Sequence, residues 1–153
     1  MVRLAERYFG TRGPATAHDF ANWSGLTVRD AHVAAAGLDR SFVRETSDGR
    51  TLIFSSVTPV ARRHAPTACL LPDYDEYGLA YRDRSAFVGG DFKPAFNRLI
   101  ALDGRFIGSW RRTLAGPQAR LELQLPSDLS ARARRAIDDA ANRYCQFIGC
   151  TRR

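Results

Sequence analysis

An Asp-Gly pair at positions 48 and 49 constrains the fold of this chain more than any other feature. It lies in Ser47-Asp48-Gly49, between two strand-like runs at residues 42–46 and 50–54. Asp-Gly favours the backbone angles of a tight two-residue turn, and apolar-rich runs on both sides make it a strong hairpin signal. The sequence therefore predicts a β-hairpin over residues 42–54.

Three short helices are expected before this hairpin. Residues 2–9 have helical apolar spacing, and Gly10 suits the end of a helix. Thr16 and Thr27 are each followed three residues later by an aspartate, which is typical of helix N-termini. The two helices that they begin are expected to end at Ser24-Gly25 and at about Ala36. Three helices followed by a hairpin wing are the order of a winged helix, and we expect this domain over residues 1–58.

A second domain is expected over residues 69–153, after a linker at 57–68 that contains two prolines. Asp103-Gly104 predicts a second hairpin, and three leucines that alternate with polar residues from Leu121 predict a half-buried strand. An amphipathic helix is expected over 129–147. The whole chain is therefore expected to be α+β, with a winged helix followed by a small β-barrel-like unit that this C-terminal helix closes.

The charge of the chain favours a polyanionic partner. The formal net charge is +7, and all but one of the 23 basic residues are arginine, whose planar guanidinium suits phosphate contacts. A GC-rich genome would also produce this excess of arginine. Residues 1–60 carry a net charge of only +1 and residues 61–153 carry +6. Charge therefore agrees with a nucleic-acid partner without identifying the domain that binds it.

Several classes of protein are not expected. Three cysteines without a repeated short spacing argue against a disulfide framework and a zinc site, so we expect no metal and no cofactor. The N-terminus lacks the pattern of a signal peptide, and no run of residues is apolar enough to span a membrane. We expect a cytoplasmic protein with no membrane partner.

Three segments of the sequence are more distinctive than these patterns. They are LLPDYDEYGLAYRDRS at 70–85, DGRFIGSWRR at 103–112 and DFANWSGLTVRDA at 19–31. Together they resemble the C-terminal part of the AlkZ-like bacterial DNA glycosylases. The resemblance implies a DNA-repair family with several winged-helix units and a C-terminal β-barrel around a DNA channel. It also implies excision of alkylated bases and unhooking of interstrand crosslinks.

The catalytic motif of that family, Gln-hydrophobic-Asp or Gln-hydrophobic-Gln, is not found here. The candidates are Gln118-Ala119-Arg120, Gln124-Leu125-Pro126 and Gln146-Phe147-Ile148, and none of them matches. No catalytic residue is therefore assigned, and we expect a non-catalytic protein. The chain could be a fragment, one product of a split gene or a natural short paralogue.

The predicted contacts with double-stranded DNA are Arg29, His32, Arg44, Arg50, Arg82, Arg84, Arg111 and Arg112. The first two lie on the expected recognition helix, although its alanines also suit close packing. The next two flank the wing turn, where they could contact phosphates or be solvated.

The other four candidates lie beyond the expected wing. Arg82 and Arg84 stand among several acidic residues and could instead form an internal ion-pair network. Arg111 and Arg112 follow Trp110 in an expected strand, where one arginine should point inward and the other outward. Trp110 itself is expected in the core.

Three functions remain open at this point. A DNA-binding protein without catalysis agrees with both the resemblance and the net charge. A shortened glycosylase would use catalytic residues that the sequence does not identify. A protein–protein module would bind a second copy of the chain or an N-terminal partner chain, and the small net charge of residues 1–60 favours it.

Overall fold

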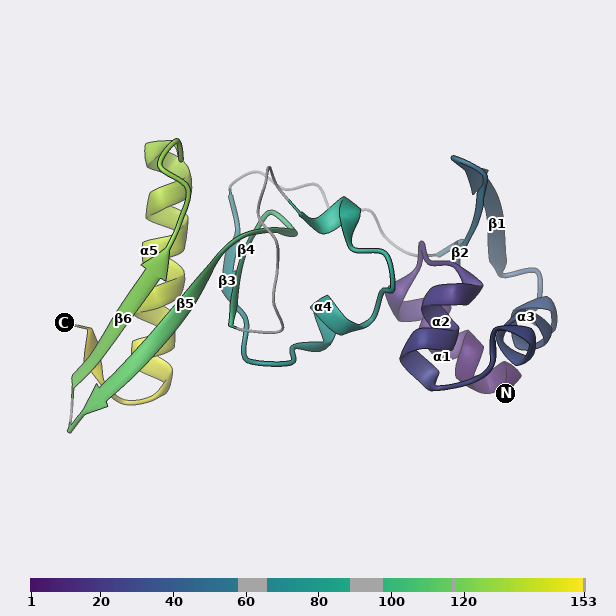
Figure 1. Cartoon of the computed structure of the whole chain (residues 1–153), viewed down its shortest axis with the longest axis horizontal. Coiled ribbons are helices and arrows are strands. Elements are labelled where there is room, and N and C mark those ends of the chain that lie inside the picture. The colour runs from purple at the N-terminus through teal and green to yellow at the C-terminus, as the bar shows by residue number, and fades with distance from the viewer. Residues whose placement is uncertain (58–65, 89–97, 117, 153) are drawn as a thin grey trace. The chain divides into compact units, whose positions relative to one another are not determined.

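The computed structural model describes residues 1–57, 66–88, 98–116 and 118–152. It divides into two compact units, one made of Met1–Arg62 and Glu76–Asp83 and the other of Arg63–Asp75 and Arg84–Arg153 (Figure 1). Most of the expected linker at 57–68 lies outside the described residues. The chain is a mixed α+β protein, as the sequence predicts. The expected domain limits of 1–58 and 69–153 stay a prediction.

The first unit begins with three helices and a hairpin. The helices are α1 Val2–Arg12, α2 Ala17–Ser24 and α3 Val28–Ala36, and the antiparallel strands are β1 Phe42–Ser47 and β2 Arg50–Ser55. Asp48 and Gly49 both have positive φ angles, 50° and 72°, as the turn between these strands requires. A four-residue helix, α4 Glu76–Leu79, also belongs to this unit.

Side-chain caps set the starts of α2 and α3. Thr16 and Asp19 form a reciprocal capping box, and the Thr27 hydroxyl accepts a hydrogen bond from the Asp30 amide. The expected end of α1 at Gly10 is wrong, because the helix continues to Arg12. It ends where the amide of Gly13 donates to the carbonyl of Phe9 (3.1 Å), directly before Pro14, which has no amide hydrogen to donate.

The core of the first unit is aromatic on one side and made of alanine on the other. Tyr8, Phe9 and Phe20 are fully buried, and their ring centroids lie 5.1–5.6 Å apart. Ala31, Ala34 and Ala35 line the buried side of α3. These small side chains allow α3 to approach its neighbours closely. This agrees with the alternative interpretation of the sequence, in which the alanines of this helix serve close packing.

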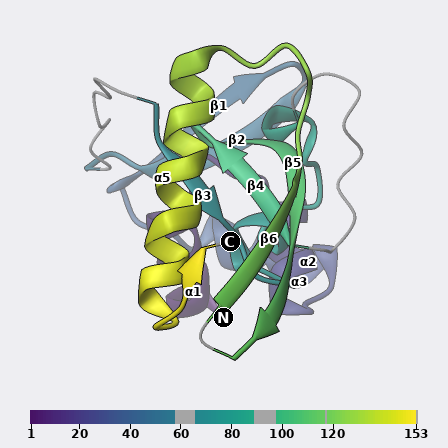
Figure 2. The same cartoon turned by 90° about the vertical axis from the view of Figure 1, so that its left-hand side faces the viewer.

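The second unit is a curled five-stranded sheet with one long helix. The sheet order is β3 Ala68–Leu70, β4 Leu99–Leu102, β5 Arg105–Ala115, β6 Gln118–Gln124 and β7 Thr151–Arg152. All neighbours are antiparallel except β6 and β7, which are parallel. The helix α5 Ala131–Phe147 lies along these strands (Figure 2), and a 3-10 helix, η1 Ser85–Phe87, precedes β4.

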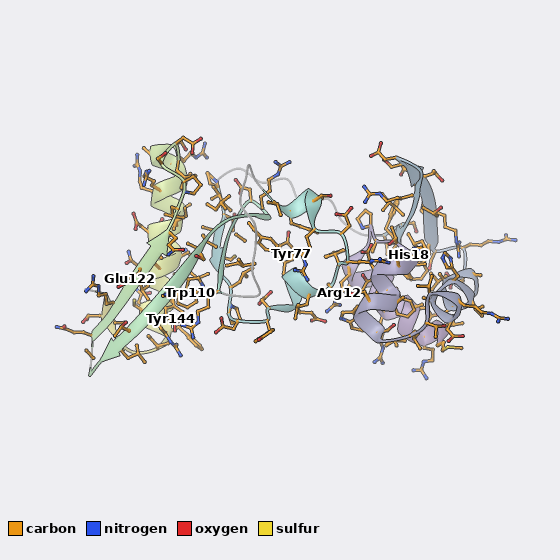
Figure 3. The ribbon with its side chains drawn as sticks, viewed as in Figure 1. Arg12, His18, Tyr77, Trp110, Glu122 and Tyr144 are labelled. Carbon is orange, nitrogen blue, oxygen red and sulfur yellow. The ribbon has the colours of Figure 1, made fainter. Side chains whose placement is uncertain are left out.

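Packing between α5 and the sheet fixes this second unit. Trp110 is only 4% exposed, as expected of a core residue, and its indole N–H donates to the carbonyl of Leu71 (2.8 Å). Its ring lies 4.8 Å from that of Tyr144 on α5 (Figure 3). Gly108 is buried where a Cβ atom would lie 2.1 Å from the carbonyl oxygen of Gln124, so only glycine fits between β5 and β6. Within the described residues, no helix is long and apolar enough to cross a membrane.

Candidate nucleic-acid interface

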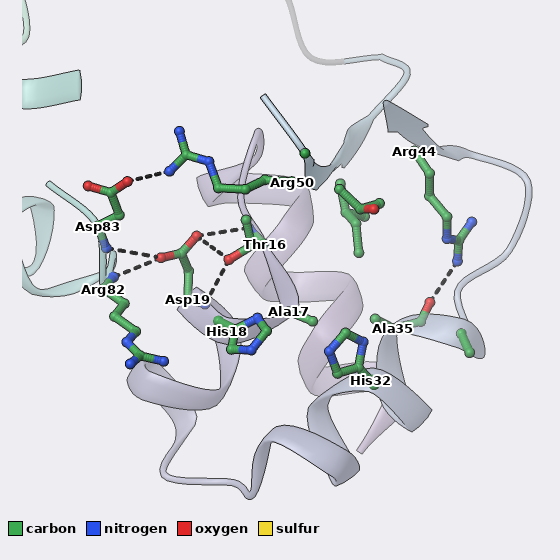
Figure 4. Close-up of a pocket in the computed structure, with 14 residues that line it drawn as sticks. Thr16, Ala17, His18, Asp19, His32, Ala35, Arg44, Arg50, Arg82 and Asp83 are labelled. Atoms are coloured by element: carbon green, nitrogen blue, oxygen red, sulfur yellow. Dashed lines mark hydrogen bonds and ion pairs between the residues drawn. The ribbon is translucent and has the colours of Figure 1, made fainter. Parts of the chain in front are cut away.

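A groove of about 870 Å³ lies between the helices and the hairpin of the first unit. His18 on α2 and His32 on α3 line it from the helical side, and Arg44 and Arg50 line it from the hairpin. Arg82, which follows α4, completes the set of basic side chains (Figure 4). Four of the eight residues predicted to contact DNA thus line one groove, although they come from three separate parts of the sequence.

The hairpin side of the groove is anchored to the end of α3. Arg44 extends from β1, and its guanidinium Nη2 donates to the backbone carbonyl of Ala35 (2.6 Å). The last carbonyls of a helix lack partners within the helix and carry partial negative charge, so a guanidinium is favourable there. This contact positions Arg44 beside the groove.

The two histidines stand together at the helical side. The rings of His18 and His32 meet edge to face, with their centroids 5.6 Å apart, and both residues are exposed. His18 was not among the predicted contacts. It lies inside the N-terminal turn of α2, and only the packing of α2 against α3 brings it beside His32.

A buried carboxylate connects α2 with the segment that carries Arg82. Asp19 is 6% exposed, and its Oδ2 accepts hydrogen bonds from the amide (2.9 Å) and the hydroxyl (2.7 Å) of Thr16. Its Oδ1 accepts from the amides of Arg82 (2.8 Å) and Asp83 (3.5 Å). One side chain therefore caps α2 and fixes residues 82 and 83 at the edge of the groove (Figure 4).

Asp83 in turn forms an ion pair with Arg50 of the hairpin. The side chains of Arg50 and Asp83 are 52% and 49% exposed, so the pair is in contact with solvent. The side chain of Arg82 points away from it (Figure 4). The sequence leaves open whether the acidic residues around Arg82 and Arg84 form ion pairs, and Asp83 forms one with an arginine of the β1–β2 hairpin.

The rest of the segment 76–83 packs behind the groove against α1 and α2. The Tyr8 hydroxyl donates to the Ala80 carbonyl (2.7 Å), and burial raises the pKa of Tyr8 well above its ordinary value. Glu76 accepts from the Trp23 indole (2.8 Å) and pairs with Arg12 (2.5 Å). These contacts lower the pKa of Glu76, the hydrogen bond from Trp23 contributing most.

The other predicted residues lie outside this groove. Arg29 is exposed on the first turn of α3 and does not line it. Arg84 is half-buried and belongs to the second unit.

Arg111 and Arg112 lie on β5 beside a second, smaller hollow of about 390 Å³, which is also lined by Arg98. Arg112 contacts the Tyr144 hydroxyl on α5. Arg111 lies opposite Glu122 in the register of β5 and β6. Arg112 thus points to the face of β5 that α5 covers and Arg111 to the opposite face, as expected of neighbouring residues in a strand, although both side chains remain exposed. Arg98 was not predicted because the sequence before it shows no strand or turn pattern that would mark a site.

Comparison with known proteins identifies the family. A family model described as DNA glycosylase AlkZ-like matches residues 2–147. The chain belongs to the AlkZ-like DNA glycosylase family. The resemblance drawn from the segments at 19–31, 70–85 and 103–112 is thereby confirmed. A search of curated proteins found no match.

A solved structure of the same family has a similar fold. Streptomyces sahachiroi DNA glycosylase AlkZ superposes with a TM-score of 0.68 at 17% sequence identity. The match covers 99% of this chain and 43% of that chain, so the chain spans less than half the length of its structural relative. At this identity, the similarity shows the fold.

Proposed function

We propose that this chain is a winged-helix DNA-binding protein that holds double-stranded DNA without excising bases. The observation that carries the proposal is the groove of the first unit, where His32, Arg44, Arg50 and Arg82 converge. In a winged helix, the second helix of the helix-turn-helix enters the major groove and the wing contacts the adjacent backbone. In this chain those elements are α3 and the β1–β2 hairpin.

The composition of the groove suits contacts with phosphates better than reading of base edges. Three of its lining side chains are arginines, which bind phosphate oxygens through planar, charged donors. Its helical wall includes Ala35 and Ala36, which have no hydrogen-bonding groups on their side chains. We therefore propose binding that depends weakly on DNA sequence. Arg29, Arg84, Arg111 and Arg112 would add phosphate contacts outside this groove.

The absence of catalysis is proposed on chemical grounds. A carboxylate that acts as the general base for base excision must face the substrate with a free oxygen. Within the described part of the groove, both oxygens of Asp19 accept hydrogen bonds from backbone or hydroxyl donors, and Asp83 pairs with Arg50. The family's catalytic glutamine motif does not occur in the printed sequence. Release of alkylated bases from damaged duplex by this chain would contradict the proposal.

A salt titration tests the binding. Affinity for a labelled duplex, measured by fluorescence anisotropy, should fall linearly with salt on logarithmic axes, with a slope of about −0.9 for each phosphate contacted. Arg82→Gln should weaken binding uniformly across DNA sequences and reduce the slope by about 1. Arg7→Gln on α1 is the matched control, because it removes the same charge from an exposed position outside the groove.

The control variant distinguishes DNA binding at the groove from attraction of DNA by the total positive charge of the protein. If Arg7→Gln lowers the affinity as much as Arg82→Gln, the groove is not the binding site. If the wild-type protein does not bind duplex DNA at low salt, the proposed function is wrong.

A further inference from the structure

The ion pair between Arg50 and Asp83 lies inside the groove that we propose for DNA. Both residues line the groove, and both side chains are about half exposed. A phosphate that approached Arg50 would therefore meet a guanidinium that already has an anionic partner.

The place of Asp83 is fixed by the fold. Asp19 accepts hydrogen bonds from the amides of Arg82 (2.8 Å) and Asp83 (3.5 Å). Because Asp19 is 6% exposed and also accepts two hydrogen bonds from Thr16, its carboxylate has little freedom to move. The backbone that carries Asp83 is thus held opposite the wing, and Arg50 reaches it from the first residue of β2.

Carboxylate and phosphate compete for the same face of a guanidinium. Each presents two oxygens at a spacing that matches the parallel N–H donors of arginine, and each is anionic. The two anions repel each other if they approach one arginine together. In this structure Asp83 contacts Nη1 of Arg50, so a phosphate that binds Arg50 through a pair of donors that includes Nη1 must displace the carboxylate of Asp83.

This displacement is feasible because solvent-exposed ion pairs are weak. Such pairs contribute little to stability, and a ligand that contacts several cations at once can replace one of them. Arg44 and Arg82 line the same groove and can hold neighbouring phosphates of one strand.

We infer that Asp83 occupies the position of a backbone phosphate at Arg50, and that a phosphate of duplex DNA takes its place on binding. The inference rests on the proposed function and names the ligand group at one position of the groove. Asp83 then acts as an internal competitor that weakens the binding of a phosphate at Arg50.

The test is a double-mutant cycle in the full chain, measured by anisotropy with a labelled duplex at one low salt concentration. Asp83→Asn removes the competing charge, and Arg50→Gln removes the proposed phosphate contact. Glu45→Gln on β1 is the matched control, because it also removes one negative charge from an exposed position on the hairpin but does not line the groove. Asp83→Ser is a second variant whose side chain is too short to replace the carboxylate at Arg50.

We expect Asp83→Asn and Asp83→Ser to lower the Kd for DNA by a factor of about three to five relative to Glu45→Gln. This is the range of Kd change that the free energy of an exposed ion pair allows. In the Arg50→Gln background, Asp83→Asn should improve binding no more than Glu45→Gln. Equal gains from Asp83→Asn and Glu45→Gln, or an undiminished gain without Arg50, would overturn the inference but leave the proposed function standing. If neither the wild type nor Asp83→Asn binds duplex DNA, both fail.

Discussion

Asp19 is the residue on which the geometry of the groove depends most. Its carboxylate is buried and accepts hydrogen bonds from Thr16 on one side and from the backbone of Arg82 and Asp83 on the other. The capping role could be predicted from the spacing between Thr16 and Asp19. The second role could not, because it joins residues that are 63 positions apart in the chain.

Asp19→Ala should destabilise the chain by about 2 kcal/mol, because it removes a capping partner and leaves the partly buried amide of Arg82 without its acceptor. Asp30→Ala removes the equivalent aspartate from α3, whose carboxylate accepts a hydrogen bond from the Thr27 hydroxyl (2.7 Å), and should cost about 1 kcal/mol. Urea unfolding of the two variants measures the difference. Equal losses would show that the link to residues 82 and 83 adds no stability.

At the scale of elements, the sequence does not predict where the segment that contains α4 packs. Residues 70–85 are the most distinctive part of the sequence, yet no periodicity in them indicates which residues they pack against. In the structure, Glu76–Asp83 belongs to the first unit, through Tyr8 and Ala80 and through Trp23 and Glu76. These contacts join distant parts of the sequence, so local propensity carries no information about them.

The elements themselves were more predictable because their signals are local. Asp48-Gly49 and Asp103-Gly104 each connect two antiparallel strands, and Thr16 and Thr27 each cap a helix. The C-terminal helix begins at Ala131 with a Ser130 cap, two residues later than expected. Strand β7 was not predicted, because its two residues pair in parallel with β6 and have no pattern of their own.

The contact of Glu76 with α1 and α2 has a consequence for stability at acidic pH. Hydrogen bonds from Trp23 and Arg12 lower the pKa of Glu76 below its ordinary value of 4.5. A lowered pKa in the folded state means that Glu76 contributes stability above pH 4.5 and loses this contribution as the pH falls further. Wild type should therefore be more stable than Glu76→Gln at neutral pH, and the difference should shrink below pH 4.5.

Chemical unfolding of both proteins across that pH range is the measurement. Asp39→Asn is the comparison variant, because hydrogen bonds from Ser41 also lower the pKa of Asp39. Asp39 lies in an exposed turn that does not involve α4, so the effect of this variant on stability at each pH does not report on the packing of α4. A gap between wild type and Glu76→Gln that stays constant through the acidic range would show that the carboxylate of Glu76 does not stabilise the packing of α4.

At the scale of the whole molecule, the net charge and the groove lie in different parts of the sequence. The net charge of +7 belongs mainly to residues 61–153, whereas the groove with the best convergence of basic side chains lies in the first unit. Arg82 comes from the second half of the sequence but lines the groove of the first unit. The same segment also brings Asp83 into the groove, so that three arginines stand there with two aspartates, Asp19 and Asp83.

The central claim is that DNA lies in the groove between α3 and the β1–β2 hairpin. The most direct measurement is an NMR titration of the isotope-labelled chain with unlabelled duplex DNA at low salt, followed through the backbone amides. The largest shifts should occur at groove residues, among them His18, His32, Arg44 and Thr51. Saturable binding that leaves these amides unchanged would contradict the claim.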